Sequence, residues 1–177
     1  MRTLHEAVAQ CRTLVVEGPD DISRAGLLAE LARGGFMIRR SRGHLHHLDP
    51  TRPYRELLAA PGLLAVDGGI IHELVYGPLR RGHSRVTWIQ ALDFAESVAE
   101  RDGALLHLTD SGRPTAPAPL ADTESAEAAD AYARAFRTLA QHVPVVTLDT
   151  GGPGPPIRAP DATACQPSRY RRKLTVR

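Results

Sequence analysis

The chain alternates between short apolar runs and longer segments in which apolar residues recur every three or four positions. The short runs are rich in leucine and β-branched residues, which is typical of strands buried on both faces of a parallel sheet. The longer segments have the period of a helix with one apolar face, and several end at glycine or proline. The predicted strands span residues 12–16, 36–40, 63–66, 104–108 and 143–148, and the predicted helices span 23–33, 53–60, 70–76, 87–101 and about 122–141.

Strands that alternate with helices imply right-handed βαβ crossovers and a parallel sheet covered on both faces. Five such strands predict a three-layer α/β domain over residues 1–150, preceded by a short helical or irregular lead-in at residues 4–11. The segment 151–177 opens with a Pro/Gly-rich run that continues neither a helix nor a central strand, and it ends in a basic run. We therefore expect it to form a tail outside the domain.

Composition narrows the class of protein without changing this fold. The 177 residues are 42% apolar and 24% charged, as in ordinary globular proteins, and the net charge of +2 is too small to indicate a nucleic-acid partner. No apolar run approaches the roughly 20 residues needed to span a bilayer, and no signal peptide is visible. We expect a cytoplasmic protein with no membrane partner.

The first strand leads into a segment that has the frame of a phosphate-binding loop. The pattern G-x-x-x-x-G-K-[ST] between a strand and a helix holds nucleotide phosphates through backbone amides, a lysine and a metal-binding hydroxyl. Counted from Gly18, the second glycine is Ser23, the lysine is Arg24 and the hydroxyl residue is Ala25. The frame is kept, and the residues that carry out the chemistry are replaced.

Three segments together resemble thymidylate kinases and related deoxynucleoside monophosphate kinases. Residues 15–20 are similar to the opening of their phosphate loop, residues 67–85 to their strand-three segment, and residues 143–149 to their last strand. The likeness covers about residues 12–150, and the run 73–78, Glu-Leu-Val-Tyr-Gly-Pro, is its most specific part. It implies a P-loop nucleotide kinase fold and a nucleotide or phosphorylated small molecule as ligand. It also implies Mg²⁺ and ATP as cofactors if the protein is active. Related kinases are often dimers, so a homodimer or a protein partner is expected, with helix 87–101 as the interface.

The resemblance also assigns a phosphate site in which several residues depart from the family. Arg24 keeps the positive charge of the lysine on a bulkier planar group, and Ser23 adds a Cβ where the backbone favours glycine. Ala25 offers no metal ligand. Asp21 places a second carboxylate near the phosphates, which is repulsive unless a cation intervenes. The implied phosphate-binding residues are Glu17, Gly18, Pro19, Asp20, Asp21, Ser23 and Arg24.

Beyond the loop, the resemblance implies catalytic and substrate-binding residues. Asp67 is kept at the strand-three position, where it would bind a metal together with Asp20 or act as a base, or else cap the next helix; Gly68 replaces the family's arginine. The segment after the fourth strand contains one arginine, Arg113, where the family has an arginine-bearing lid. The catalytic residues that the resemblance implies are therefore Asp67, Arg24 and Arg113. The implied substrate-binding residues are Tyr76, which would stack on a base or pack in the core, Arg81 and Arg85.

Three functions stay open from the sequence. The leading hypothesis is a divergent kinase-like protein that binds a nucleotide or phosphorylated small molecule with phosphotransfer weakened or lost. The second is an active nucleoside monophosphate kinase in which Arg24 replaces the lysine and an aspartate holds Mg²⁺. The third is a metal-dependent hydrolase, because imidazole and carboxylate groups that bind Zn²⁺ or Fe²⁺ gather at His44, His46, His47 and Asp49.

Overall fold

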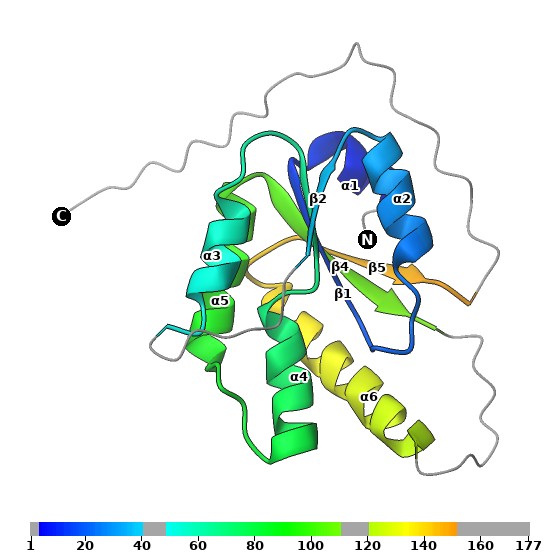
Figure 1. Cartoon of the computed structure of the whole chain (residues 1–177), viewed down its shortest axis with the longest axis vertical. Helices are drawn as coiled ribbons and strands as arrows, with labels where there is room; N and C mark the ends of the chain where they lie inside the picture. Colours follow the sequence, from blue (N-terminus) through cyan, green and yellow to red (C-terminus); the bar gives the residue numbers. More distant parts are fainter. Residues whose placement is uncertain (1–3, 41–48, 111–120, 152–177) are drawn as a thin grey trace.

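Five parallel strands form one sheet in the order β2-β3-β1-β4-β5, so the first strand lies at the centre (Figure 1). The computed structural model describes residues 4–40, 49–110 and 121–151. All strand pairs run parallel, which places the carboxyl ends of the five strands at one edge of the sheet. The strands are β1 (Thr13–Glu17), β2 (Met37–Arg40), β3 (Leu64–Asp67), β4 (Gly103–Thr109) and β5 (Val145–Asp149).

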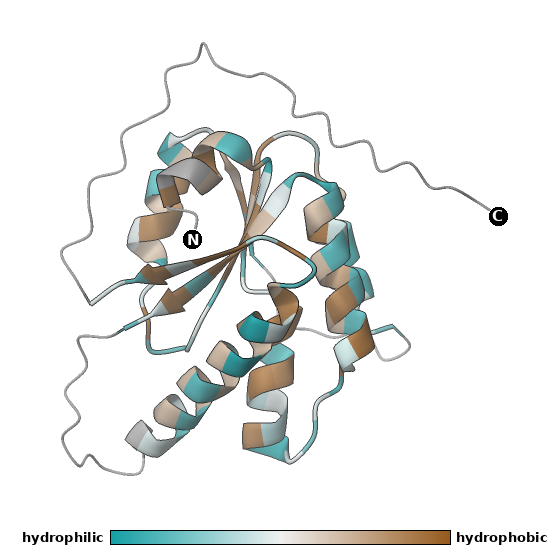
Figure 2. Cartoon of the chain, turned by 180° about the vertical axis from the view of Figure 1, so that it is seen from behind, coloured by the Kyte–Doolittle hydropathy of each residue, from teal (hydrophilic) through white to brown (hydrophobic). Residues whose placement is uncertain are grey.

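Helices cover both faces of the sheet and confirm the predicted three-layer α/β fold. Two separate hydrophobic cores lie one on each face, and the central strands are largely apolar (Figure 2). One face packs against α1 (Leu4–Gln10) and α2 (Ala25–Arg33). The other packs against α3 (Arg52–Leu58), α4 (Ile70–Arg81), α5 (Trp88–Glu100) and α6 (Ala121–Leu139).

Alternation along the central strand decides which side chains reach which core. Leu14 and Val16 belong to the core under α1 and α2, and Val15 belongs to the core under α3–α6. Glu17, two residues after Val15, therefore points toward α4 and α6. Its register partner on β4 is His107, which faces the same way.

Helix α4 differs from the sequence prediction, because it does not break at Gly77 and Pro78. It continues to Arg81 and ends where Gly82 adopts φ +75°, with its N–H donating to the Pro78 carbonyl at 2.9 Å. Gly77 is needed for packing instead. A Cβ on it would come within 2.9 Å of the Ser84 Cα, so the returning chain can lie directly on the helix. The remaining elements lie close to their predicted positions, and residues 4–10 form a helix.

No helix within the described residues is long and apolar enough to cross a membrane. The predicted tail, apart from Gly151, lies outside the described residues, as does the part of the loop after β4 that contains Arg113.

Candidate functional site

The segment after β1, residues 18–24, lies at the carboxyl edge of the sheet. Two of its backbone amides donate hydrogen bonds to other groups of the protein. The backbone N–H of Asp20 donates to the Tyr76 hydroxyl at 2.9 Å, and that of Ile22 donates to the Pro19 carbonyl at 3.2 Å. In a phosphate loop such amides point at the ligand. Here these two amides are already bonded to protein oxygens.

Gly18 has a packing reason to be glycine. A Cβ there would lie 2.9 Å from both the Cβ and the carbonyl oxygen of Leu108 on β4. The close approach of residue 18 to β4 requires glycine at this position, whatever the segment binds.

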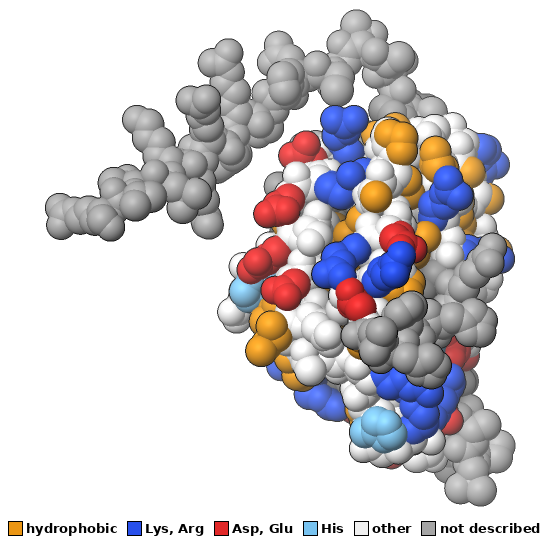
Figure 3. Space-filling model, turned by 60° about the vertical axis from the view of Figure 1, so that its left-hand side comes forward, with side chains coloured by type: hydrophobic (Ala, Val, Ile, Leu, Met, Phe, Trp, Pro, Cys, Tyr) orange, Lys and Arg blue, Asp and Glu red, His pale blue; other side chains and the backbone are white. Residues whose placement is uncertain are grey.

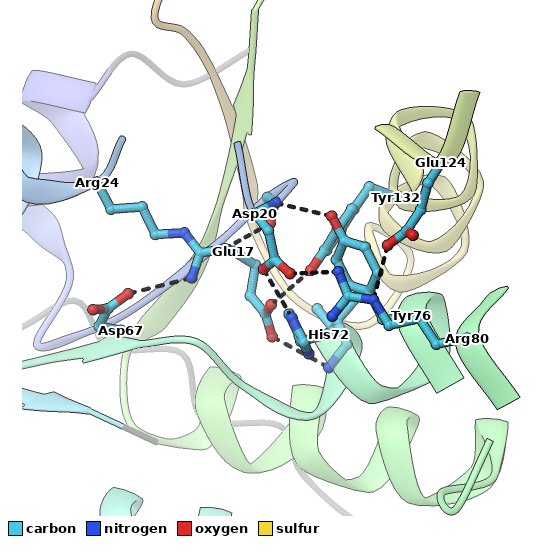
Figure 4. Close-up of polar contacts among 11 residues, drawn as sticks. Glu17, Asp20, Arg24, Asp67, His72, Tyr76, Arg80, Glu124 and Tyr132 are labelled. Carbon is cyan, nitrogen blue, oxygen red and sulfur yellow. Dashed lines mark hydrogen bonds and ion pairs between the residues drawn. The ribbon is translucent and has the colours of Figure 1, made fainter. Parts of the chain in front are cut away.

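Arg24, at the position of the family's lysine, is turned back onto the protein (Figure 4). One guanidinium nitrogen donates to the Gly18 carbonyl at 2.6 Å, and the other lies 3.4 Å from Asp67 Oδ1. Arg40 Nε lies 3.2 Å from the second oxygen of Asp67. Asp67 and Arg24 are therefore brought together as predicted. However, they are joined as an ion pair, with only 15% of the Asp67 side chain and 17% of the Arg24 side chain exposed.

The residue after Asp67 explains one departure from the family. Gly68 adopts φ +77°, a conformation that residues with a side chain rarely take. An arginine at this position would be strained, so the conformation of the turn into α4 favours glycine.

Glu17 does not line the phosphate site with its side chain, contrary to the sequence prediction. Its carboxyl is fully buried between the sheet and helices α4 and α6. It accepts the N–H of Ile71 at 3.2 Å, and the Tyr132 hydroxyl lies 3.5 Å from its other oxygen. Burial raises the pKa of Glu17 from 4.5 to about 7, against the opposing effects of the Arg24 charge and of backbone donors.

Two further polar groups share this buried region. The His107 ring stacks on Phe136, with ring centroids 4.3 Å apart, and burial lowers its pKa from 6.5 to about 4. Burial, followed by the neighbouring Glu17 charge, raises the pKa of Tyr132, which keeps the hydroxyl protonated as a donor. At neutral pH the region holds a neutral imidazole, a phenol and a carboxyl group near its midpoint of titration.

On the other side of the loop, Asp20 is held by side chains of α4. Asp20 Oδ1 lies 2.9 Å from His72 Nε2, and its Oδ2 accepts from Arg80 at 2.9 Å. Burial opposes ionisation of this carboxyl, but the charges and hydrogen bonds of His72 and Arg80 outweigh it and lower the pKa of Asp20. The neighbouring Asp21 accepts from Ser125 Oγ of α6 at 2.6 Å.

Tyr76 packs in the core rather than presenting its ring to a ligand. It is 4% exposed, the Arg80 guanidinium lies 4.0 Å above its ring centroid, and the His72 ring lies 4.6 Å away, centroid to centroid. Stacking of Tyr76 on a base is therefore wrong for this conformation, and the packing alternative holds. The hydroxyl contributes instead by fixing the Asp20 amide.

Of the two predicted substrate arginines, Arg81 contacts Glu73 through its side chain and Arg85 contacts it through its backbone. The Arg81 guanidinium forms an ion pair with the Glu73 carboxylate, which also accepts the backbone N–H of Arg85 at 2.9 Å. These contacts close the turn after α4. The arginine of this segment that does reach the loop is Arg80, which sequence reasoning did not assign.

Of the predicted metal ligands in the histidine-rich segment, Asp49 alone lies within the described residues. His44, His46 and His47 lie outside the described residues. Asp49 accepts from the backbone N–H and the hydroxyl of Thr51 at 3.0 and 2.7 Å, at the start of α3. Among residues 4–40, 49–110 and 121–151, no group of three or more His, Cys, Asp or Glu side chains is placed to hold a metal ion.

A hollow of about 720 Å³ lies between the edge strand β2 and helix α3. Figure 3 shows the face that carries α3, where basic side chains lie among acidic and hydrophobic ones. Arg40 lines this hollow and also contacts Asp67, so the hollow adjoins the carboxyl edge of the sheet. The lining residues are Arg39, Arg40, Pro53, Glu56, Leu57, Ala59, Ala60 and Pro61.

Comparisons with known proteins agree with the fold. No family model matches the sequence, and no curated protein is similar enough to count as a match. Among solved structures, the chain is similar to the crystal structure of the YorR protein from Bacillus subtilis in complex with phosphorylated GDP. The TM-score is 0.62 and the identity 13%, over 78% of this chain and 86% of that chain. This likeness confirms the P-loop kinase-like fold with its five-stranded parallel sheet.

Proposed function

We propose that this chain is a divergent relative of the thymidylate kinase group that binds a nucleotide or another phosphorylated small molecule, with phosphotransfer weakened or lost. The observation that carries the proposal is the engagement of Arg24. Its guanidinium is bonded to the Gly18 carbonyl and paired with Asp67, so the cation that would neutralise transferred phosphate is occupied by the protein.

The residues present do not fit Mg²⁺ and ATP in the way an efficient kinase requires. Ala25 has no oxygen ligand, and the two oxygens of Asp67 face Arg24 and Arg40. Both oxygens of Asp20 face nitrogen donors. A metal ion at either carboxylate would have to displace a cationic or imidazole partner, so we derive no catalytic step through it.

Ligand binding is supported by two observations. The hollow beside Arg39 and Arg40 has the size of small-molecule sites in proteins, which span about 300–1,000 Å³. The similar YorR protein was solved with phosphorylated GDP.

A homodimer through α5 remains part of the proposal, and Trp88 and Ile89 in its first turn are 46% and 71% exposed.

Calorimetric titration with ATP·Mg²⁺ and with a panel of nucleoside monophosphates, combined with product detection, tests the proposal. We expect heats of binding without turnover on the kinase scale of about 1–100 s⁻¹. Arg40→Met, which removes an arginine that lines the hollow, should weaken nucleotide binding, whereas Arg33→Met, at an exposed arginine in the last turn of α2, should leave it unchanged. Turnover within that range would establish the active kinase instead, and the absence of any binding would refute the proposal.

A further inference from the structure

The strongest unassigned feature is the group of side chains that grips Asp20. It comprises His72 and Arg80 on α4, Tyr76 beneath them, and Glu124 on α6, and is called here the α4 anion seat (Figure 4). His72 and Arg80 come from successive parts of one helix face, and both direct nitrogen atoms at the same carboxylate. Neither residue belongs to the sites inferred from the sequence.

The geometry of the seat is that of a site for an anion. Because an ionised carboxylate only accepts hydrogen bonds, His72 Nε2 must carry the proton in its 2.9 Å contact with Asp20. The Arg80 guanidinium supplies a second, charge-assisted bond to the other oxygen at 2.9 Å. Two donors thus hold two oxygens of one anion, an arrangement that serves phosphate oxygens equally well.

The remaining contacts hold the donors in place. Arg80 Nε is bonded to Glu124 at 2.8 Å, which turns the other edge of the guanidinium toward Asp20. The Tyr76 ring lies under the guanidinium, and its hydroxyl fixes the Asp20 amide at 2.9 Å. A preorganised arginine loses less conformational entropy when it binds an anion.

The seat is open to solvent. The side chains of His72, Asp20 and Arg80 are 35%, 43% and 44% exposed. A ligand could therefore reach the donors if the Asp20 side chain moved aside, without any change in the core.

We infer that His72 and Arg80 form a binding site for the phosphoryl group of a phosphate monoester, and that the Asp20 carboxylate occupies this site in the free protein. This inference rests on the proposed binding of phosphorylated small molecules and names residues that would hold the ligand. The apparent affinity of the site is reduced by the fraction of molecules in which Asp20 fills it.

Titration with inorganic phosphate at constant ionic strength tests the inference. Asp20→Asn removes the competing charge with little change of shape, so it should tighten phosphate binding about tenfold. In the same background, Arg80→Met should abolish the gain. Phosphate should also shift the ¹⁵N resonance of His72 Nε2 in the Asp20→Asn protein.

Asp21→Asn is the matched control. It removes one carboxylate from the same loop, and this carboxylate accepts a hydrogen bond from Ser125 Oγ at 2.6 Å. An equal gain in Asp21→Asn would show that only the net charge of the loop matters and would overturn the inference. A gain that persists after Arg80→Met, or no gain in Asp20→Asn, would overturn it as well.

Comparing the affinities of dTMP and ribose 5-phosphate for the Asp20→Asn protein shows which kind of phosphate monoester the seat prefers. Equal affinities support a seat that recognises the phosphoryl group alone, and tighter dTMP binding supports a nucleotide ligand. The two proposals can be distinguished with the same ligands. Nucleotide binding that requires Arg40 and not Arg80 would support the proposed function while overturning the seat, and the absence of nucleotide binding would overturn the proposed function.

Discussion

The buried carboxyl of Glu17 makes folding stability depend on pH in a direction opposite to that of most carboxylates. Its pKa is about 7 in the folded protein and 4.5 without burial. Below pH 4.5 the group is protonated in both states. Between pH 4.5 and about 7 the folded state binds more protons than the unfolded state, so the free energy of unfolding falls as pH rises. At 1.36 kcal/mol for each pKa unit, the loss is about 3 kcal/mol by pH 8.

Glu17→Gln isolates this effect. The amide is neutral at every pH, its oxygen can accept the Ile71 N–H, and its NH₂ group can donate to the Tyr132 hydroxyl. As pH rises from 4.5 to 8, we therefore expect the free energy of unfolding of the variant to increase by about 3 kcal/mol relative to that of the natural protein. His107 titrates over an overlapping range with the opposite sign, so the comparison of variant and natural protein is more informative than either profile alone.

Urea denaturation followed by far-UV circular dichroism, at pH values from 4.5 to 8, measures this difference. Glu127→Gln, at an exposed position of α6, is the control and should change stability by less than about 0.5 kcal/mol throughout. The reasoning would be refuted if the difference in free energy of unfolding between Glu17→Gln and the natural protein stayed constant with pH within about 1 kcal/mol. A variant that is less stable at pH 8 would refute it as well, because the carboxylate would then be stabilised by its partners.

Other positions give independent predictions. Gly69→Ala places a Cβ 2.6 Å from Oε1 of the buried Glu17 carboxyl group. It should lower the free energy of unfolding, measured by urea denaturation, by about 2 kcal/mol. Gly26→Ala, in a helix with no atom within 4 Å of the new Cβ, should stabilise the protein by about 0.5–1 kcal/mol; equal signs for the two glycines would contradict the packing argument. His107→Phe keeps a ring that can stack on Phe136. As pH falls from 6.5 to about 4, its free energy of unfolding should rise by about 3 kcal/mol relative to the natural protein, because the unfolded imidazole then binds a proton that the folded one does not. A pH-independent difference would count against this prediction. The double substitution Arg24→Lys with Ala25→Thr should tighten ATP·Mg²⁺ binding about tenfold in calorimetry. Arg24→Lys with Ala25→Val, which matches the size without the hydroxyl, should gain less.

Much of the fold follows from patterns that lie within a few residues of each other. The apolar run at residues 14–16 and the helical spacing at residues 87–101 predict β1 and α5 because burial on a sheet or helix face repeats at short range. The end of α4 was missed because Gly77 and Pro78 are ordinary breakers. Gly77 is retained here by the approach of Ser84, which only the folded chain reveals.

The site was less predictable because its contacts join distant parts of the chain. Glu17 was assigned to the phosphate site from its position beside Gly18. The alternation of β1 could have placed it with Val15 on the α4 and α6 face instead. No local pattern brings Asp20 to Arg80, or Arg80 to Glu124, since these pairs depend on how α4 and α6 dock.

The central position of β1 has a consequence for how the protein is made. Thr13 pairs with Leu64 on one side and with Gly103 on the other, so the neighbours of this strand are synthesised about 50 and 90 residues after it. At about 5–20 residues per second, the apolar strand waits about 5–20 s for its second partner. During that time the nascent chain exposes a strand that can pair with other chains. Slow synthesis should therefore favour aggregation, and binding of a chaperone to residues 13–17 should favour the soluble protein.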